Sequence, residues 1–237
     1  MREIVFLAIV TVALALTVGC GGSDGPSASP APTLNPADFS AAVDNPLFPL
    51  AGIGPKVFEG DETDPDSGEA FHTRIEHTVL PQTETIGGVE AAVLQDREYH
   101  DGELVEATLD YFAQHRDGSV WYLGERVDEY EDGQLVGHEG QWLSGDGDNR
   151  AGVYMPAQPA AGQKFNQENA PGIAEDQSEV IAVDAAVEVP AGSFTGCLKA
   201  RDSSPLDDVT EFKYYCPGVG LVREEPPEGT VDLISYK

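Results

Sequence analysis

Residues 101–133 read DGELVEATLDYFAQHRDGSVWYLGERVDEYEDG, and this stretch decides the fold. Three Asp-Gly steps, at Asp101, Asp117 and Asp132, divide it into two segments rich in Val, Leu, Tyr and Trp. Asp-Gly readily adopts the positive-φ turns that match the right-handed twist of paired strands. Each step therefore predicts a β-hairpin, and the stretch as a whole predicts consecutive antiparallel strands.

Apolar and polar residues alternate between the first two turns. Val105, Leu109 and Tyr111 fall on one face of the expected strand, and Glu106 and Asp110 fall on the other. Such alternation is typical of a strand with one face buried and one face toward solvent. The simplest interpretation is that the acidic face is solvated.

The same pattern extends along the chain, with further turn signals at Ser67-Gly68 and Gly87-Gly88. It predicts strands at Lys56–Gly60, Glu69–Leu80, Val89–His100, Glu103–Gln114, Val120–Tyr130, Gln134–Trp142, Gln163–Gln167, Gln177–Val189, Phe194–Arg201, Glu211–Cys216, Leu221–Glu225 and Thr230–Tyr236. No segment after Pro36 sustains a helical period. So many strands are expected to curl. The sequence therefore predicts an all-β fold, an antiparallel meander whose curved sheet forms a half-barrel, barrel or sandwich.

The N-terminus has a different character from the rest of the chain. Ile4–Val18 is apolar apart from two Thr residues, and it is shorter than the about 20 residues needed to span a bilayer. It is followed by Gly19-Cys20, so that the end of the run resembles the bacterial lipobox. The resemblance implies a signal peptide over residues 1–19 and a diacylated Cys20. Thr17 departs from the usual Leu of that motif, so ordinary secretory cleavage and a retained membrane anchor are the alternatives.

A tether follows the predicted lipidation site. Residues 20–36 hold the lipidated Cys and a run of Gly, Ser, Ala and Pro that cannot bury a core. Residues 37–237 are expected to form a single β domain. Acyl chains on Cys20 would hold that domain at the cell membrane, facing the extracytoplasmic side.

The remaining cysteines fit an exported protein. Cys197 and Cys216 form an even pair, which in an oxidising compartment predicts a disulfide. They fall on two expected strands joined by a short loop, where the two residues would lie roughly opposite each other. Two free thiols or a catalytic cysteine are the alternatives.

The chain is strongly acidic, with a formal net charge of −29 over 237 residues. A nucleic-acid partner is excluded by this charge, since phosphate backbones are bound through Lys and Arg. The hydrophobic fraction of 41% is enough for a core and argues against wholesale disorder. On a β domain, such charge keeps sheet surfaces soluble and discourages pairing of exposed edges.

Several short motifs resemble those of an uncharacterised family of bacterial exported proteins and lipoproteins. They are the NPLFPL run at residues 45–50, DYFAQ at 110–114, VWYLGE at 120–125, MPA at 155–157, QE at 167–168, PG at 171–172, AED at 174–176, KYY at 213–215 and PGVG at 217–220. The resemblance implies no activity and no catalytic residue. In strand pattern the chain is also similar to exported half-barrels that carry lipids or lipoproteins, an analogy of fold alone.

The acidic residues of the predicted sheet suggest one kind of site. Glu106 and Asp110 would lie about 13 Å apart on one strand face. Glycosidase carboxylates lie closer than about 10 Å, so this pair alone makes a poor hydrolytic dyad. Neighbouring strands would bring Asp96, Glu98 and Glu125 nearby, and such a cluster raises a pKa or holds a cation.

Aromatic residues suggest a second kind of site. The most clustered along the chain are Trp121, Tyr122, Trp142, Tyr154 and Phe165. They are candidates for a ligand groove, with packing in the core as the alternative. Trp121 and Tyr122 are adjacent in one expected strand, so only one of them can line a given interior.

Metal and catalytic motifs are weak. Oxygen-rich turns place Asp61, Asp64 and Asp66 in one loop and Asp146 and Asp148 in another, but neither turn has the EF-hand spacing. We therefore expect no cofactor, with calcium as a weak candidate. The sequence lacks a Gly-x-Ser-x-Gly motif and a phosphate-binding Gly-rich loop, and we assign no catalytic residue.

Three functional hypotheses follow. The first is a lipid-anchored, noncatalytic binding or carrier module for an apolar or amphipathic ligand, which requires an apolar cavity of about several hundred Å³. The second is an interaction or structural protein of the envelope, with or without calcium. The third is a hydrolase that uses the acidic face.

Overall fold

The computed structural model describes residues 34–65, 67–207 and 209–237. The predicted signal peptide, Cys20 and most of the tether therefore lie outside the described residues. Within the described ranges, no helix is long and apolar enough to cross a membrane.

Antiparallel strands make up most of the described chain, and its helical content is one 3₁₀ turn at Pro36–Asp38. The strands are β1 (Phe39–Ser40), β2 (Lys56–Thr63), β3 (Ala70–Ile86), β4 (Val89–His100), β5 (Glu103–His115), β6 (Val120–Glu131), β7 (Gln134–Gly137), β8 (Trp142–Leu143), β9 (Arg150–Met155), β10 (Lys164–Asn166), β11 (Glu168–Asn169), β12 (Gln177–Val189), β13 (Gly192–Ser203), β14 (Thr210–Cys216), β15 (Gly220–Glu225) and β16 (Gly229–Tyr236). The predicted all-β class is confirmed.

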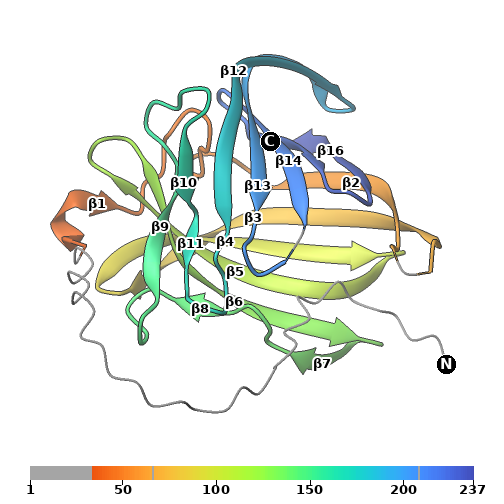
Figure 1. Ribbon diagram of the computed structural model, residues 1–237, viewed down its shortest axis with the longest axis horizontal. Coiled ribbons are helices and arrows are strands. Elements are labelled where there is room, and N and C mark those ends of the chain that lie inside the picture. Colours follow the sequence, from red (N-terminus) through yellow and green to blue (C-terminus); the bar gives the residue numbers. More distant parts are fainter. Residues whose placement is uncertain (1–33, 66, 208) are drawn as a thin grey trace, which may run out of the picture.

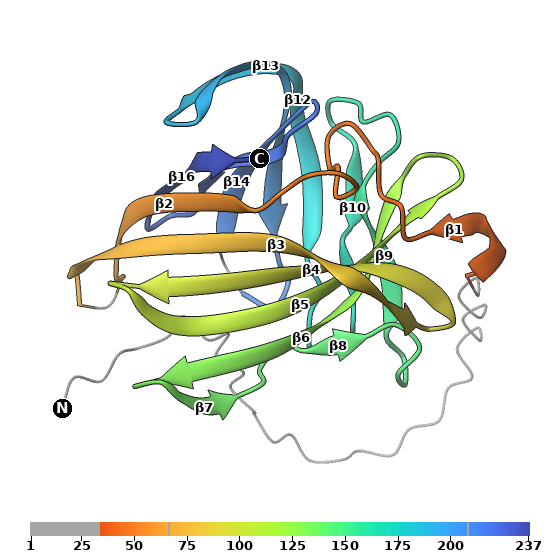
Figure 2. The same cartoon turned by 180° about the vertical axis from the view of Figure 1, so that it is seen from behind.

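The strands form one sheet that curls into a nearly closed barrel (Figures 1 and 2). Its order is β10-β12-β13-β14-β15-β16-β2-β3-β4-β5-β6-β9-β11. Outside this path, β7 and β8 pair with β6, and β1 pairs with β5. The two ends of this path lie close together, because β10, at one end, contacts β9, which pairs with β11 at the other end. Of the three predicted architectures, the barrel is therefore the one observed.

The turns form as the sequence predicts. Asp101 and Asp132 adopt φ angles of 51° and 49°, and the glycine after each also has positive φ. These are the left-handed conformations that the two-residue hairpin turns require. They join β4 to β5 and β6 to β7 and so fix the meander at its centre.

Some strand predictions are wrong. Gln134–Trp142 was expected as one strand, but Gly140, at φ 77°, lies in a turn that divides it into β7 and β8. β1, β9 and β11 were not predicted. β1 and β11 have only two residues each, and β9 begins with Arg-Ala-Gly, which lacks the β-branched and aromatic residues typical of strands. β3 continues beyond the expected Leu80 to Ile86, and its Pro81 lies within a register shift between Val79 and Thr83, where no regular ladder bond is needed.

The barrel interior holds the main core, and a loop before β2 closes part of it. Val43, Phe48 and Leu50 of this loop are buried among the strands. Asn45 fixes the loop, since its side-chain amide donates to the Gly118 carbonyl at 2.9 Å and its side-chain oxygen accepts from the Leu47 N–H at 2.9 Å. The NPLFPL run thus places Phe48 inside the barrel.

A second apolar cluster lies on the outer face of the sheet. Its members include Val89, Val93, Tyr111 and Leu123, and partly buried side chains such as Phe39 pack against it. The apolar face of β5 therefore packs outside the barrel, and the polar face points inward. The expectation of a solvated acidic face is wrong at Asp110, which is 9% exposed.

Cys197 and Cys216 are joined by a disulfide, as predicted, between β13 and β14. Their Cα atoms lie 4.2 Å apart, and the register Leu198↔Tyr215 places the two cysteines opposite each other. Closing a loop of this length stabilises a fold by about 3 kcal/mol in the chain-entropy model. The bond holds together two strands that both supply side chains to the cavity described next.

Candidate ligand-binding site

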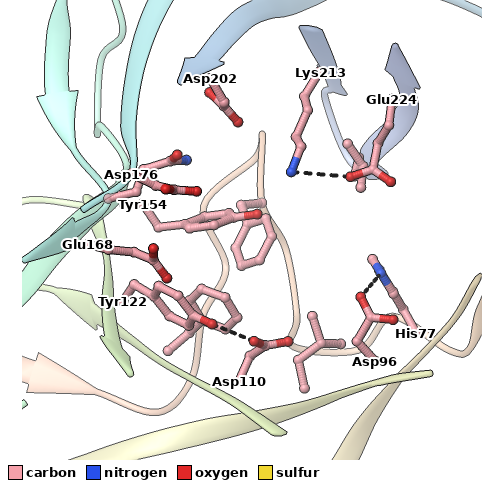
Figure 3. A pocket seen from close by; sticks show the side chains of 15 residues that line it. His77, Asp96, Asp110, Tyr122, Tyr154, Glu168, Asp176, Asp202, Lys213 and Glu224 are labelled. Carbon is pink, nitrogen blue, oxygen red and sulfur yellow. Dashed lines mark hydrogen bonds and ion pairs between the residues drawn. The ribbon is translucent and has the colours of Figure 1, made fainter. Parts of the chain in front are cut away.

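A partly enclosed cavity of about 190 Å³ lies inside the barrel (Figure 3). Six carboxylate side chains line it, from six segments of the chain: Asp96, Asp110, Glu168, Asp176, Asp202 and Glu224. Two groups of opposite character accompany them, His77 of β3 and Lys213 of β14. The cavity is therefore strongly acidic, and the apolar cavity expected for a carrier is not what the structure contains.

Asp110 and Tyr122 form the closest polar contact of the cavity. The Tyr122 hydroxyl lies 2.5 Å from Asp110 Oδ1 and 3.1 Å from Glu125 Oε2. A tyrosine hydroxyl has one proton and can donate to only one of these carboxyls, so the other must be protonated to complete the contact. Burial, followed by the charge of Asp96, raises the pKa of Asp110 to about 7. Burial and the charge of Glu168 raise the pKa of Glu125 well above its usual range.

Glu168 is another acid of the cavity whose pKa is raised. The Trp142 indole N–H donates to Glu168 Oε1 at 3.2 Å. Burial, and next the charge of Asp176, raise the pKa of Glu168 to about 8. β8 brings Trp142 here because it pairs with β6 at Gly124, where φ is 125° and a Cβ would overlap the Trp142 carbonyl oxygen.

The two cationic groups already have partners. Lys213 Nζ lies 2.7 Å from Glu211 and 3.3 Å from Glu224, and His77 Nε2 lies 2.8 Å from Asp96. Nearby carboxylates, Glu211 first, outweigh burial and raise the pKa of Lys213 well above its usual range. Lys213 therefore stays charged, but its charge is shared with two carboxylates.

Asp202 differs from the other acids of the cavity. Its side chain points into the cavity (Figure 3), and the residue is 5% exposed. Within the described part of the chain, its Oδ1 is the buried side-chain atom that has no hydrogen-bond partner. Burial raises its pKa to about 6, although the charge of Lys213 acts in the opposite direction. A buried carboxylate oxygen without a donor costs free energy and marks a place for a ligand's N–H or O–H.

Aromatic rings form one wall of the cavity. Phe112 stacks on Tyr122 with ring centroids 4.7 Å apart and meets Tyr154 edge-on at 4.8 Å. The ring centroids of Phe48 and Tyr154 lie 4.6 Å apart. Aromatic faces beside carboxylates suit an organic cation, because the rings attract positive charge and also contact hydrocarbon.

Of the five aromatic residues predicted to line a ligand groove, three lie at the cavity and two do not. Tyr122 and Tyr154 line the cavity, and Trp142 supports it from behind. Phe165 packs, partly buried, against the barrel core. Trp121 faces the outer cluster, where it meets Phe39 edge-on at 5.8 Å, so the two neighbours at positions 121 and 122 point to opposite sides as expected.

The predicted acidic residues are brought together as cross-strand pairs. Glu98 lies opposite Glu106, and Asp110 lies opposite Glu125. Asp96 and Asp110 line the cavity, whereas Glu106 is exposed and Glu98 contacts His100 at 2.6 Å. The cluster is real, but its centre lies inside the barrel.

The weak calcium candidates that the structure describes are exposed or partly exposed. Asp61 contacts His72 at 2.9 Å, Asp64 lies in the β2–β3 turn, and Asp66 lies outside the described residues. Asp146 and Asp148 are exposed in the turn before β9. In the ranges that the structure describes, no group of three or more His, Cys, Asp or Glu is arranged to hold a metal ion.

Most of the cavity's acids were missed from the sequence. Asp176, Asp202 and Glu224 come from the C-terminal half of the chain, and nothing in their local sequence links them to Asp96 or Asp110. One signal was present. Asp202 continues the buried alternation of Leu198 and Ala200, so it is a carboxylate at a core position.

Comparisons with known proteins add little. No protein-family model and no curated protein matches the chain. A crystal structure from Parabacteroides distasonis, of a protein described provisionally as a lipoprotein, is 16% identical with a TM-score of 0.41. That match covers 81% of this chain and 98% of the other. The resemblance to an uncharacterised exported family stays a prediction.

Proposed function

We propose that the protein is a lipid-anchored, exported binding protein whose barrel holds a small organic cation. Six carboxylates face a cavity in which Lys213 and His77 supply the positive charge. Both of these groups are already paired with acids. A ligand that brings its own positive charge would offset the remaining negative charge at lower cost than any neutral or anionic ligand.

The observation that carries this proposal is the free oxygen of Asp202. Native proteins leave few buried acceptors without a donor, so each one needs an explanation. An ammonium group in the cavity would donate to this oxygen and would neutralise part of the surrounding charge. Charge-assisted hydrogen bonds of this kind are about twice as strong as neutral ones.

The size of the cavity limits the ligand. A protein cavity of about 150 Å³ holds one benzene-sized molecule, so 190 Å³ suits a molecule of similar size. A lipid acyl chain is too long and too apolar for it. The proposed ligand class therefore narrows from the predicted apolar or amphipathic molecule to a small amphipathic cation, whose hydrocarbon part would contact Phe48, Phe112 and Tyr154.

Binding of n-butylammonium tests this proposal, with 1-butanol as the neutral probe of matched length. We expect calorimetry at pH 7.5 to detect the amine and not the alcohol, because only the amine can pair with the carboxylates. In Asp202→Asn the amine should bind at least about tenfold more weakly. The matched control is Asp148→Asn, an acid in an exposed turn, which should bind as the wild type does. Equal binding of amine and alcohol would sink the proposal.

Lipid anchoring at Cys20 is the second part of the proposal and has its own measurement. The intact mass of membrane-extracted protein should include a diacylglycerol group on Cys20, and Cys20→Ala should move the protein to the soluble fraction. The two acyl chains dominate membrane affinity because each buried CH₂ contributes about 0.8 kcal/mol. Full membrane retention of Cys20→Ala would show that another segment is the anchor.

A further inference from the structure

Lys56 is a largely buried lysine that has no partner among the described residues. It is the first residue of β2, opposite His77 of β3, and it is 8% exposed. Among the described residues, no carboxylate or hydrogen-bond acceptor contacts its ammonium nitrogen. Burial lowers the pKa of Lys56 to about 8, so it is still mostly charged at pH 7. A buried and unpaired ammonium is costly, and a ligand's anionic group would relieve that cost.

The Lys56 side chain lines a small recess of about 20 Å³ next to the acidic cavity. The recess and the cavity share a wall, formed by Phe48, His77, Leu94 and Leu221. A recess of this size has room for one small polar group, since a single water needs about 10–15 Å³. Three of the four shared residues are apolar, so the region between cavity and recess suits hydrocarbon.

The charges of the two spaces differ in sign. Carboxylates line the cavity, Lys56 lines the recess, and the apolar side chains of Phe48, Leu94 and Leu221 line both. Lys213 lines the cavity, but it is occupied by Glu211 and Glu224. Lys56 is therefore the lysine available to an anionic group of a ligand.

We infer that the barrel binds a zwitterion of the ω-amino acid class, with its ammonium group beside Asp202 and its carboxylate in the recess at Lys56. This inference rests on the proposed function, because it assumes that the cavity takes the cationic end. The hydrocarbon chain between the two charged ends would contact Phe48, Leu94 and Leu221. Two charged ends held at a fixed separation make the site selective for chain length.

Two series of probes test the inference at pH 7. One series is the ω-amino acids from glycine to 6-aminohexanoate. The other is the n-alkylamines, each with the same number of carbons as the amino acid with which it is compared. In the wild type, at least one amino acid should bind about tenfold or more tighter than its amine, because a second charge-assisted contact forms. In Lys56→Met that ratio should fall to about one while the amine's Kd changes less than about twofold. Lys164→Met, at a lysine whose side chain is 69% exposed, is the matched control and should keep the wild-type ratio.

The outcomes separate the two claims. If alkylamines bind but no amino acid in the series exceeds its amine, the inference is overturned and the proposed function stands. If neither series binds, the proposed function itself has failed. Lys56→Met and Lys56→Gln should both melt at or above the wild-type temperature, because they remove an unpaired buried charge. The wild-type ratio decides the inference even if one variant does not fold.

Discussion

Lys213→Met is expected to lower the free energy of unfolding by about 3 kcal/mol, because it removes a lysine that is paired with carboxylates at the cavity. Its nitrogen lies 2.7 Å from Glu211 and 3.3 Å from Glu224, and its charge also favours the ionised forms of Asp176 and Asp202. Without it, His77 would be the remaining cationic group among the described residues that line the cavity. Since 21% of the Lys213 side chain is exposed, the effect should lie at the lower end of the range for broken buried ion pairs.

Chemical denaturation at pH 7.5 measures this effect. Adding Glu224→Gln to Lys213→Met should recover part of the lost stability, because the double variant has one fewer unpaired carboxylate. Lys164→Met is the matched control, since its surface contact with Glu179 at 3.5 Å should contribute less than about 1 kcal/mol. A Lys213→Met variant as stable as the wild type would mean that the cavity acids are uncharged or solvated.

Binding of an alkylammonium is expected to strengthen as the pH rises from 5.5 to 8. Burial raises the pKa of Asp110 to about 7, of Glu168 to about 8, of Asp202 to about 6 and of Glu224 to about 7. At pH 5.5 these carboxyls carry protons, which a cation must displace, whereas at pH 8 most are ionised. The displacement of one proton changes Kd by up to about tenfold per pH unit, so we expect at least about a tenfold change overall.

The empty protein should respond to pH in the opposite direction. The pKa values of these carboxyls in the folded chain lie above their ordinary values of 3.8 and 4.5, so the folded state binds more protons than the unfolded state between about pH 4 and pH 8. Its unfolding free energy therefore falls as the pH rises through that window. Below pH 4 both states are protonated and this contribution is constant.

Calorimetry in two buffers of different ionisation enthalpy counts the protons released on binding. We expect about one proton at pH 6.5, and fewer in Asp110→Asn, which removes one titrating group of the cavity. Asp148→Asn should release the wild-type number. Of the cationic groups that face these carboxyls, Lys213 keeps its charge across this pH range, because its pKa is raised well above its usual value. His77, whose pKa is also raised, loses its proton as the pH rises and would strengthen cation binding in the same direction. The smaller proton release of Asp110→Asn is therefore the result that assigns the effect to the carboxyls. A Kd that is constant from pH 5.5 to 8 would contradict this picture.

Local sequence signals were sufficient for most of the fold. The Asp-Gly steps at Asp101 and Asp132 formed hairpins because their turn conformations depend on only two residues. The disulfide followed from the count of cysteines and the short loop between their strands. Strands β9 and β11 were missed, because they are specified by contacts with distant strands and not by their own composition.

Alternation of apolar and polar residues could not determine which face of the sheet points into the barrel. A two-faced strand such as β5 can present either face to the barrel interior, and here Tyr111 packs outward while Asp110 points inward. Only closure of the barrel decides between the two, and closure depends on strands far apart in the sequence. The same closure gathers Asp202 and Lys213 around Asp110, which is why the acidic cavity was not predicted.

A crystal structure of the protein with n-butylammonium tests the central claim most directly. We expect the ammonium nitrogen inside the barrel, within hydrogen-bond distance of Asp202 Oδ1, with its hydrocarbon chain against the aromatic wall of Phe112 and Tyr154. An ammonium bound only outside the barrel, or a cavity that holds no amine at a saturating concentration, would contradict the claim.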